Sequence, residues 1–444
     1  MTGEGLKEKR VLVVGAGIAG IQAALDLAEA GISVVLAERG DSIGGRMAQT
    51  DKTFPTLDCS SCTLTPRTAD AGNHPNIRLL TRTTPEDVRR RGSGFVVSLK
   101  KNPRFVDPGA CVACGKCAEA CRMAGRVRST FDLGLKKISA VGMPFPQAVP
   151  MSYAVDAAHC LFLSRGKCGK SPACADACSV NAIHFDEREM VEELAVDGII
   201  LATGYELYRP DDEVFGRPEL GYGKYPEVLT NLQFERLSSA SGPTGGKLKI
   251  AGKEPRSIVF LQCVGSRDKT TGASYCSRVC CMASLKQAVL ALEKLPGVEI
   301  TVLYMDMRAF GKGYEEFMER AQRMGAVLRR GNPSEVYRAG DSLAVRFEDT
   351  FLKRPMELKA DAVILAAGLR PGSSTSALSG IFGVPLGADG FFEHANPLDP
   401  SASPVQGIYV AGAAGGPMDI PDAVASGSAV AGACLASFLA GEHP

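Results

Sequence analysis

The residues of this chain with the clearest chemical potential are its cysteines. The sequence of 444 residues contains 15 cysteines and only 5 histidines. All but Cys434 fall into four groups: Cys59 and Cys62; Cys111, Cys114, Cys117 and Cys121; Cys160, Cys168, Cys174 and Cys178; and Cys263, Cys276, Cys280 and Cys281. Residues 1–10 are polar and lack the apolar segment and cleavage site of a signal peptide, so we expect a cytoplasmic protein. Because thiols stay reduced there, the groups predict metal binding or redox chemistry rather than structural disulfides.

The group from Cys111 to Cys121 has the spacing Cys-x2-Cys-x2-Cys-x3-Cys. This spacing is typical of bacterial-type ferredoxins, in which three thiolates bind one [4Fe–4S] cluster and the fourth binds a second cluster. The group from Cys160 to Cys178 has longer first spacings and keeps the final x3. By analogy, one cluster would be bound by Cys111, Cys114, Cys117 and Cys178, and the other by Cys160, Cys168, Cys174 and Cys121.

Zinc is the competing interpretation of these eight cysteines, since four thiolates also suit a structural zinc site. Arg122 and Ser179 stand where ferredoxins usually have proline, which is a departure from their pattern. Both groups nevertheless end in Cys-x3-Cys, and this favours two clusters over zinc.

The group formed by Cys263, Cys276, Cys280 and Cys281 does not have a ferredoxin pattern. It follows the strand-like segment SIVFLQ, where a pyridine-nucleotide reductase would have a second GxGxxG motif. Since that phosphate cradle is missing, we do not expect direct binding of NAD(P)H. Four neighbouring thiolates suffice for a third [4Fe–4S] cluster, which would exchange single electrons in place of hydride.

The elements that would position this chemistry begin with a dinucleotide-binding unit. The segment VLVVGAGIAGIQAALDLAEAGISVVLAE reads as strand, tight turn, helix and strand. Gly15 allows the turn, Gly17 lets the backbone approach a pyrophosphate, and Gly20 lets the helix pack closely on the strand. Glu38, at the end of the second strand, can accept hydrogen bonds from the adenosine ribose. The whole unit predicts a bound dinucleotide.

Later segments favour FAD as that dinucleotide. The segment SIGGRMAQ, with Gly44, Gly45 and Arg46, resembles the second phosphate-contacting turn of flavoproteins that have two dinucleotide-binding domains. The segments GIILATGY, with Gly204, and AVILAAGLRP resemble the places where such chains cross between their two domains. FAD is therefore the expected cofactor of this unit.

The C-terminal segment GIYVAGAAGG resembles the last strand of an FAD domain. Many such flavoproteins have Asp after the glycine that corresponds to Gly412, but this chain has Ala413, so a carboxylate contact to the ribityl chain is not expected. A helix from about Pro421 would point its N-terminus at the flavin. Its apolar residues 423–440 are rich in Ala, Gly and Ser, which favours a buried helix over a transmembrane one, with Cys434 as a small core residue.

These segments predict an α/β fold: a thioredoxin- or disulfide-reductase-like flavoprotein with two dinucleotide-binding domains and an inserted α+β, dicluster ferredoxin-like domain. The expected ranges are 1–100 for the first part of the FAD-binding Rossmann domain, 101–190 for the insertion, 191–255 for the continuation and crossover, 256–357 for the unit that is similar to an NAD(P)H domain and carries the third cluster, and 358–444 for the C-terminal part of the FAD domain.

The numbers of basic residues (50 Lys and Arg) and acidic residues (49 Asp and Glu) are almost equal, so no nucleic-acid partner is expected.

Several segments resemble the HdrA family, the flavoprotein subunits of heterodisulfide reductases. They are GGRMAQTDKTFPTLDCSSCTLTP, MPFPQAVP, CVGSRD with YCSRVCCMASLKQA, and AFGKGYEEFMERAQ, and the likeness extends over essentially the whole chain. It implies FAD, three [4Fe–4S] clusters, and a complex with iron–sulfur acceptor subunits and an electron-delivering module. A homodimer and peripheral association with a membrane complex are compatible with it. Long family members carry further domains before and after the corresponding segment, which leaves open whether this flavin splits electron pairs.

The resemblance also implies roles for three side chains. Lys286 would lie near N5 of the flavin, where a positive charge stabilises the reduced form and raises the potential. A solvated surface lysine is the alternative. Cys59 and Cys62 form a Cys-x2-Cys pair in a place similar to that of the flavin-facing dithiol of disulfide reductases. We expect a redox or ligand role for this pair, against a structural or partner-contact role.

The expected function is electron transfer, with the flavin as a relay or bifurcation hub between a donor module and a disulfide-, quinone- or ferredoxin-linked acceptor module. One alternative is an NAD(P)H-dependent FAD and iron–sulfur oxidoreductase similar to the small subunit of glutamate synthase. The other is a scaffold that only holds clusters for its partners. The histidines show no metal-binding spacing, and we expect His74, His159 and His184 to be loop or packing residues.

Overall fold

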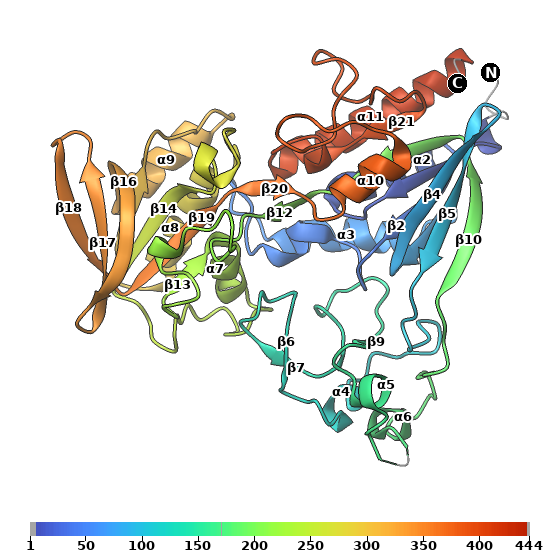
Figure 1. The fold of residues 1–444 in the computed structure, drawn as a ribbon, viewed down its shortest axis with the longest axis horizontal. Helices are drawn as coiled ribbons and strands as arrows, with labels where there is room; N and C mark the ends of the chain where they lie inside the picture. The colour runs from blue at the N-terminus through green and yellow to red at the C-terminus, as the bar shows by residue number, and fades with distance from the viewer. Residues whose placement is uncertain (1–5, 170, 442–444) are drawn as a thin grey trace.

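The computed structural model describes residues 6–169 and 171–441. Its elements form three units (Figure 1). Two units lie side by side, and each is built on a sheet. The third has little regular structure and lies beneath the other two. Its residues come from the middle of the first unit's sequence, as expected for an insertion.

The first unit is built on a five-stranded parallel sheet with the order β21-β11-β1-β2-β3. Successive residues of β1 face opposite sides of this sheet. Val11 and Val13 pack with helices α2 and α11, whereas Leu12 and Val14 pack with a three-stranded sheet of order β10-β5-β4. Because both faces are buried, β1 is hydrophobic at nearly every position. The bounds are β1 Arg10–Val14, β2 Ser33–Glu38, β3 Ile77–Thr81, β4 Thr83–Arg91, β5 Gly94–Lys101, β10 Met190–Val196, β11 Gly198–Leu201, β21 Ile408–Val410, α2 Ile18–Glu29, α3 Ser60–Asn73, α10 Thr375–Phe382, α11 Ile420–Ala440, η1 Gly45–Gln49 and η4 Gly412–Ala414.

Helix α2 follows β1 through the glycine turn expected from the sequence. Gly15 has a φ of +100°, and a Cβ added there would lie 2.5 Å from the carbonyl oxygen of Ala202. A Cβ added at Gly20 would lie 2.0 Å from the carbonyl oxygen of Gly15. The helix can therefore pack directly on the strand only because both positions lack a side chain.

The second unit is built on a seven-stranded sheet with the order β13-β19-β14-β15-β16-β17-β18. Strand β19 pairs in parallel with both β13 and β14. The sheet therefore takes strands from residues 228–230 and 362–367, outside the expected range of 256–357, because the two ends of this unit pair side by side at one edge of the sheet. Helices α7, α8 and α9 pack on one face. The bounds are β13 Val228–Thr230, β14 Ser257–Val264, β15 Glu299–Tyr304, β16 Ala326–Ala339, β17 Ser342–Asp349, β18 Arg354–Ala360, β19 Ala362–Ala367, α7 Asn231–Ser238, α8 Cys280–Lys294, α9 Tyr314–Arg323, η2 Pro218–Leu220 and η3 Lys269–Thr271.

Two strands carry the chain between the first and second units. Strands β12 (Tyr205–Leu207) and β20 (Leu369–Pro371) pair antiparallel and cross the junction together (Figure 1). The outgoing and returning segments are therefore hydrogen-bonded to each other, which ties the two sheets at one narrow connection.

The inserted unit leaves the first unit between β5 and β10. These strands pair antiparallel, with Phe95 opposite Val196 and Lys101 opposite Met190. Because the insertion starts and ends on neighbouring strands, the sheet closes without it. Its helices and strands are short, and its small core includes Cys160 and Cys174. Their bounds are α4 Lys116–Ala120, α5 Leu161–Arg165, α6 Ala173–Asp176, β6 Val127–Arg128, β7 Lys137–Ile138, β8 Val141–Gly142 and β9 Ala154–Val155.

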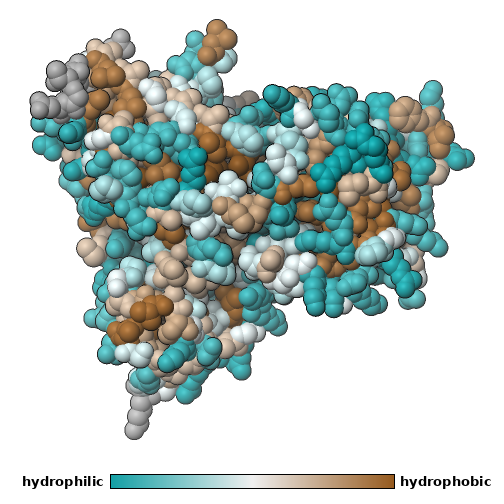
Figure 2. Space-filling model, turned by 180° about the vertical axis from the view of Figure 1, so that it is seen from behind, coloured by the Kyte–Doolittle hydropathy of each residue, from teal (hydrophilic) through white to brown (hydrophobic). Residues whose placement is uncertain are grey.

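Helix α11 is, among the described residues, the one helix long and apolar enough to cross a membrane by length and composition. In this fold it packs along α2, and Val430, Cys434 and Phe438 are buried in the core of the first unit. Seen from behind the view of Figure 1, the molecule has a mostly hydrophilic surface with scattered hydrophobic patches, one of them on the lower lobe (Figure 2). Exposed apolar side chains of the inserted unit include Val112 and Met151.

Candidate functional site

A cavity of about 740 Å³ lies where the three units meet, and it is large enough for a cofactor. Its walls come from the glycine turn after β1, the end of β2, the η1 turn, both crossover segments, helices α7 and α8, and two loops of the inserted unit. The residues expected at the site that line it are Gly15, Gly17, Glu38, Gly45, Arg46, Gly204, Ala413 and Lys286.

Gly44 and Gly412, two glycines expected at the cofactor, are not among the lining residues that the structure describes, and neither is Gly20, which was expected to pack the helix on the strand. Each instead permits close packing behind the cavity wall. A Cβ at Gly44 would lie 3.2 Å from Leu64, and one at Gly412 would lie 2.6 Å from the Cβ of Ala19. Their neighbours Gly45 and Ala413 form the wall, because successive residues of a turn cannot all face the same side.

The glycine cradle leaves open space beside the backbone at two positions. A Cβ added at Gly17 or at Gly204 would meet no protein atom within 4 Å, and both residues line the cavity. Gly17 is also the N-cap of α2, so the free N–H groups of the first helical turn face this space. The cradle therefore fits a phosphate group that approaches a helix N-terminus.

Glu38 is held at the end of β2 by two backbone groups. Its Oε2 accepts a hydrogen bond from the N–H of Ala16 at 2.9 Å, and its Oε1 accepts one from the N–H of Gly40 at 2.7 Å. Each carboxylate oxygen can accept a further hydrogen bond. The carboxylate is thus fixed at the cavity wall with capacity left for ribose hydroxyl groups.

A buried ion pair forms the opposite wall. Lys286 Nζ on α8 lies 2.7 Å from Glu235 Oε1 on α7, and the two side chains are 3% and 4% exposed. The same Nζ donates to the carbonyl oxygen of Lys52 at 2.8 Å. Lys286 is therefore a buried, paired lysine at the cavity and not a solvated surface residue. Sequence reasoning missed Glu235, which lies on a short helix without a distinguishing motif.

Three buried polar atoms at the cavity have no hydrogen-bond partner in the described structure: Thr203 Oγ1, Asn231 Oδ1 and Gln287 Oε1. The orientation of Gln287 is fixed, because its Nε2 donates to the carbonyl oxygen of Asn231 at 3.0 Å and to Glu235 Oε1 at 2.5 Å. Buried polar atoms usually have partners. These acceptors therefore fit a ligand with N–H donors, such as a flavin ring. The sequence does contain a signal for this polar site, namely two adjacent polar residues, Lys286 and Gln287, within a helix that is mostly buried.

The inserted unit contributes an aromatic part of the wall. Phe131 and Phe145 line the cavity and stack with ring centroids 5.0 Å apart. Helix α7 and the η1 turn hold Phe131 and its neighbour in place, since Arg236 Nε on α7 lies 3.0 Å from Asp132 Oδ1 in a buried ion pair, and Gln49 Nε2 donates to the carbonyl oxygen of Phe131 at 2.8 Å. No sequence motif marks these contacts.

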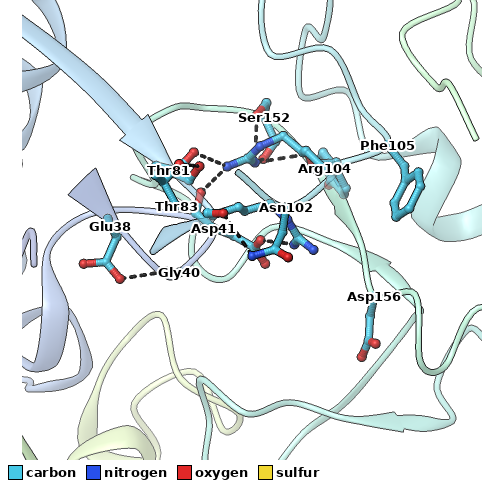
Figure 3. A network of polar contacts seen from close by, with 12 residues as sticks. Glu38, Gly40, Asp41, Thr81, Thr83, Asn102, Arg104, Phe105, Ser152 and Asp156 are labelled. Atoms are coloured by element: carbon cyan, nitrogen blue, oxygen red, sulfur yellow. Dashed lines mark hydrogen bonds and ion pairs between the residues drawn. The ribbon is translucent and has the colours of Figure 1, made fainter. Parts of the chain in front are cut away.

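Arg104 ties the inserted unit to the first unit near the adenosine end of the cavity. Figure 3 shows its guanidinium group between the two units. It donates to Ser152 Oγ at 3.1 Å on the inserted unit and to Thr81 Oγ1 at 2.9 Å and the carbonyl oxygen of Asp41 on the first unit. Burial lowers the pKa of Arg104, and nearby Asp41 opposes that effect. Hydrogen bonds from Arg104 therefore hold the inserted unit to the first unit close to the point where the insertion begins.

The first predicted set of cysteines comes together in the inserted unit. The pKa of Cys117 is raised to about 11, mainly by burial and further by the neighbouring thiols of Cys111, Cys114 and Cys178. We call these four residues the first quartet. Cys178 joins three residues of the other sequence group, as the ferredoxin analogy requires.

The second set comes together in the complementary way. The pKa of Cys174 is raised to about 12, mainly by burial and further by the thiols of Cys121, Cys160 and Cys168. These four residues are the second quartet. Cys121 and Cys178 have thus exchanged places between the two sequence groups.

The third set comes together at the start of α8 in the second unit. The pKa of Cys280 is raised, above all by burial and then by the thiols of Cys281, Cys263 and Cys276. These four residues are the third quartet. Helix α8 thus carries thiols at its first turn and Lys286 at the cavity.

In the described part of the chain, no three side chains among Cys, His, Asp and Glu come close enough to hold a single metal ion. The preference for clusters over zinc therefore rests on the ferredoxin-type spacing of the cysteines in the sequence.

Cys59 and Cys62 form a disulfide at the start of α3, with their Cα atoms 5.2 Å apart. Neither residue belongs to the cavity wall as far as the structure is described. Thr50, Lys52 and Phe54, which precede the pair, do line the cavity. The redox or ligand role of Cys59 and Cys62 stays a prediction.

Comparisons with known proteins agree with this geometry. A family profile described as an NAD(P)-binding Rossmann-like domain matches residues 13–80. The chain is 43% identical over 440 residues to the HdrA protein of the H(2):CoB-CoM heterodisulfide,ferredoxin reductase of Methanothermobacter marburgensis, covering 98% of this chain and 65% of that protein. It is 45% identical over 439 residues to the second of two HdrA iron–sulfur proteins of the CoB–CoM heterodisulfide reductase of Methanopyrus kandleri, again covering 98% and 65%.

Over nearly its whole length the chain is similar to these HdrA proteins. It spans about two thirds of the length of these curated relatives, 65% in both cases. Among solved structures, the thioredoxin reductases of T. acidophilum and Lactococcus lactis match with a TM-score of 0.54. The first is 15% identical and covers 97% of this chain and all of its own, and the second is 14% identical and covers 98% and all of its own. The thioredoxin-reductase-like fold expected for this chain is thus confirmed.

Proposed function

We propose that the chain is an electron-transfer subunit that binds FAD in the central cavity and three [4Fe–4S] clusters at its quartets. The observation that carries this proposal is that one cavity is bounded by the nucleotide cradle, by the helix that starts in the third quartet, and by the inserted unit that holds the other two. Bound FAD can exchange electrons singly or in pairs, whereas clusters exchange one at a time.

The residues of the chain have distinct parts in this proposal. The Gly17 cradle and Glu38 would hold the pyrophosphate and ribose, and Phe131 with Phe145 would exclude water from the ring. Glu235 holds the ammonium group of Lys286 at the cavity. A buried positive charge there would favour reduced flavin, since it stabilises added negative charge.

An NAD(P)H-dependent reaction is disfavoured by the loop after β14. The turn at Gly265 has a φ of +71°, and a Cβ added there would lie 2.1 Å from the ring of Tyr208. Tyr208 is buried and occupies the space beside this turn, where a nucleotide-binding domain would cradle the pyrophosphate. Protein partners are the better electron donors and acceptors, and the relatives are named as subunits of heterodisulfide reductases.

The test is reduction of the purified chain by chemical one-electron donors and by NADH or NADPH. We expect the flavin and cluster absorbance to bleach with the one-electron donor and to stay unchanged with either pyridine nucleotide. Rapid bleaching by NADH or NADPH alone would favour the oxidoreductase alternative. Clusters that bleach while a bound flavin stays oxidised at every potential would favour the scaffold.

A further inference from the structure

The proposed function leaves one covalent redox group without a role, the disulfide between Cys59 and Cys62. Cys62 is exposed and Cys59 is half-buried. Since the described cavity wall includes neither residue, a soluble reagent can reach the disulfide from the surface without entering the cavity. The pair is thus separate from the flavin site but lies at the end of a loop that belongs to it.

That loop, residues 50–59, connects the disulfide to the cavity. Thr50, Lys52 and Phe54 line the cavity. At the other end, Lys52 forms a β-bridge with Cys59, and the N–H of Ser60 donates to the carbonyl oxygen of Asp51 at 3.1 Å. The bridge between Lys52 and Cys59 therefore closes this cavity-lining loop, and Cys59 at its far end is one half of the disulfide.

The same loop contacts both members of the buried ion pair. The N–H of Asp51 donates to Glu235 Oε2 at 3.0 Å, and the carbonyl oxygen of Lys52 accepts from Lys286 Nζ at 2.8 Å. Lys52 thus forms the β-bridge with Cys59 and also accepts a hydrogen bond from the buried Lys286. A shift of the loop would move the partners of Lys286 and Glu235 together.

We propose that Cys59 and Cys62 form a thiol–disulfide exchange site for dithiols, and that its redox state sets the affinity of the cavity for FAD. The second part rests on the proposed function. The disulfide ties Cys59, at the end of the 50–59 loop, to the first turn of α3, so the oxidised protein holds the wall in its binding form and binds FAD more tightly. Reduction releases that constraint.

The exchange proceeds by attack on the exposed sulfur. A thiolate of the dithiol attacks Cys62 Sγ, the Sγ–Sγ bond breaks, and Cys59 leaves as a thiolate. The N–H of Cys62 donates to Cys59 Sγ at 3.2 Å, and the start of α3 favours negative charge there, so Cys59 is the better leaving group. The second thiol of the reagent then releases Cys62. The reagent loses two electrons and two protons and becomes a disulfide, and the protein pair gains them.

Peptide mapping tests the exchange site. The whole chain with its cofactors is equilibrated anaerobically at fixed ratios of reduced to oxidised dithiothreitol, its thiols are alkylated, and it is digested with trypsin. Peptide 53–67, TFPTLDCSSCTLTPR, contains both cysteines and no others. We expect it to pass from no label to two labels as the ratio rises. Two labels at every ratio, or none at any ratio, would overturn the exchange site.

FAD binding to the two redox forms tests the coupling. We expect the dissociation constant of FAD to rise about fivefold on reduction of the wild-type protein, the low end of typical coupling between sites. The Cys59→Ser, Cys62→Ser double variant should bind like the reduced protein at every ratio, because Ser keeps an N-cap acceptor at position 59. Ser61→Ala, between the two cysteines, should behave like the wild type.

The outcomes separate this inference from the function on which it rests. Equal affinity of the oxidised and reduced wild-type protein would overturn the coupling while FAD binding itself stands. Absence of FAD binding in both redox forms would overturn the proposed function and the coupling together, and the labelling of peptide 53–67 would still report on the exchange site.

Discussion

In the first unit, the groups that face the cavity sit at the ends of strands whose hydrophobic residues pack elsewhere, such as Val13 and Leu36. In the inserted unit, the predicted ligands are themselves part of the packing: Cys160 and Cys174 are buried in its core, and Cys117 packs against it. The first unit has a large core that can form before any cofactor binds. The inserted unit has elements of a few residues and a small core in which two cysteines lie beside residues such as Val127 and Val155, so we expect its fold to depend on the clusters proposed there.

Removing one buried cysteine from each of these two units should give the largest difference between them. Cys174→Ala should remove the second cluster and make the inserted unit sensitive to proteases throughout 101–190, because the ligand is also a core residue. Iron content and limited proteolysis measure both effects. Cys434→Ala is the matched control, since Cys434 is fully buried in the first unit's core and lies in no quartet. If both variants kept full iron content and the same protease resistance, the dependence of the inserted unit on its clusters would be wrong.

The buried ion pair between α7 and α8 tests how far the second unit depends on a polar contact. Lys286→Met should destabilise the protein by about 3–5 kcal/mol, because Glu235 is left charged and buried without its partner. Urea unfolding followed by the fluorescence or circular dichroism of the folded chain measures this loss. The flavin potential of the variant should also become more negative.

A double variant serves as the control for that pair. Adding Glu235→Gln to Lys286→Met removes the unpaired charge, so it should recover about 1–3 kcal/mol of the loss. Strictly additive losses in the two single variants and the double variant would show that the pair does not interact as the geometry indicates. An unchanged flavin potential in Lys286→Met would remove the proposed electronic role of the lysine.

Two glycines of the same turn separate folding from binding in the first unit. Gly20→Ala should destabilise the unit by about 3 kcal/mol, since its Cβ would lie 2.0 Å from the carbonyl oxygen of Gly15. Gly17→Ala should leave the melting temperature of the cofactor-free protein unchanged, because its Cβ meets only open space, and should weaken FAD binding about tenfold, or ~1.4 kcal/mol. Thermal melts and FAD titration distinguish them. Equal effects of both substitutions on the melt would contradict the assignment of Gly17 to the cavity.

The smallest expected effect concerns the contacts of Arg104 between the inserted unit and the first unit. Arg104→Lys keeps the positive charge but cannot make the guanidinium contacts to both units, and it should cost about 1–2 kcal/mol. We expect hydrogen exchange to increase at residues 152–155 and near Thr81, with iron content unchanged. Protection equal to that of the wild type at both segments would show that the insertion is held by its strand connections alone.

The sequence predicted well those features that depend on local spacing. The turn with Gly15 and Gly17, the acid Glu38 at a strand end and the crossovers all follow from patterns within about thirty residues. The structure also groups the thiols as the ferredoxin spacing predicts, although the ligand assignment itself stays a prediction.

Contacts between distant segments could not be predicted in this way. Glu235 meets Lys286, and Phe131 reaches the cavity, only after the units have packed, and no periodicity marks such residues. Gly44 and Gly412 were expected at the cofactor because a motif gives the turn but not which of two adjacent residues faces the cavity. For Cys59 and Cys62 the spacing indicated a redox or ligand role but not whether the pair lines the cavity.

The ratio of iron to FAD in the protein, purified without oxygen, tests the central claim most directly. Three quartets that each hold four irons, with one FAD in the cavity, predict about twelve iron atoms per flavin. A ratio near four would contradict the assignment of two clusters to the inserted unit, and with it the account of why that unit folds.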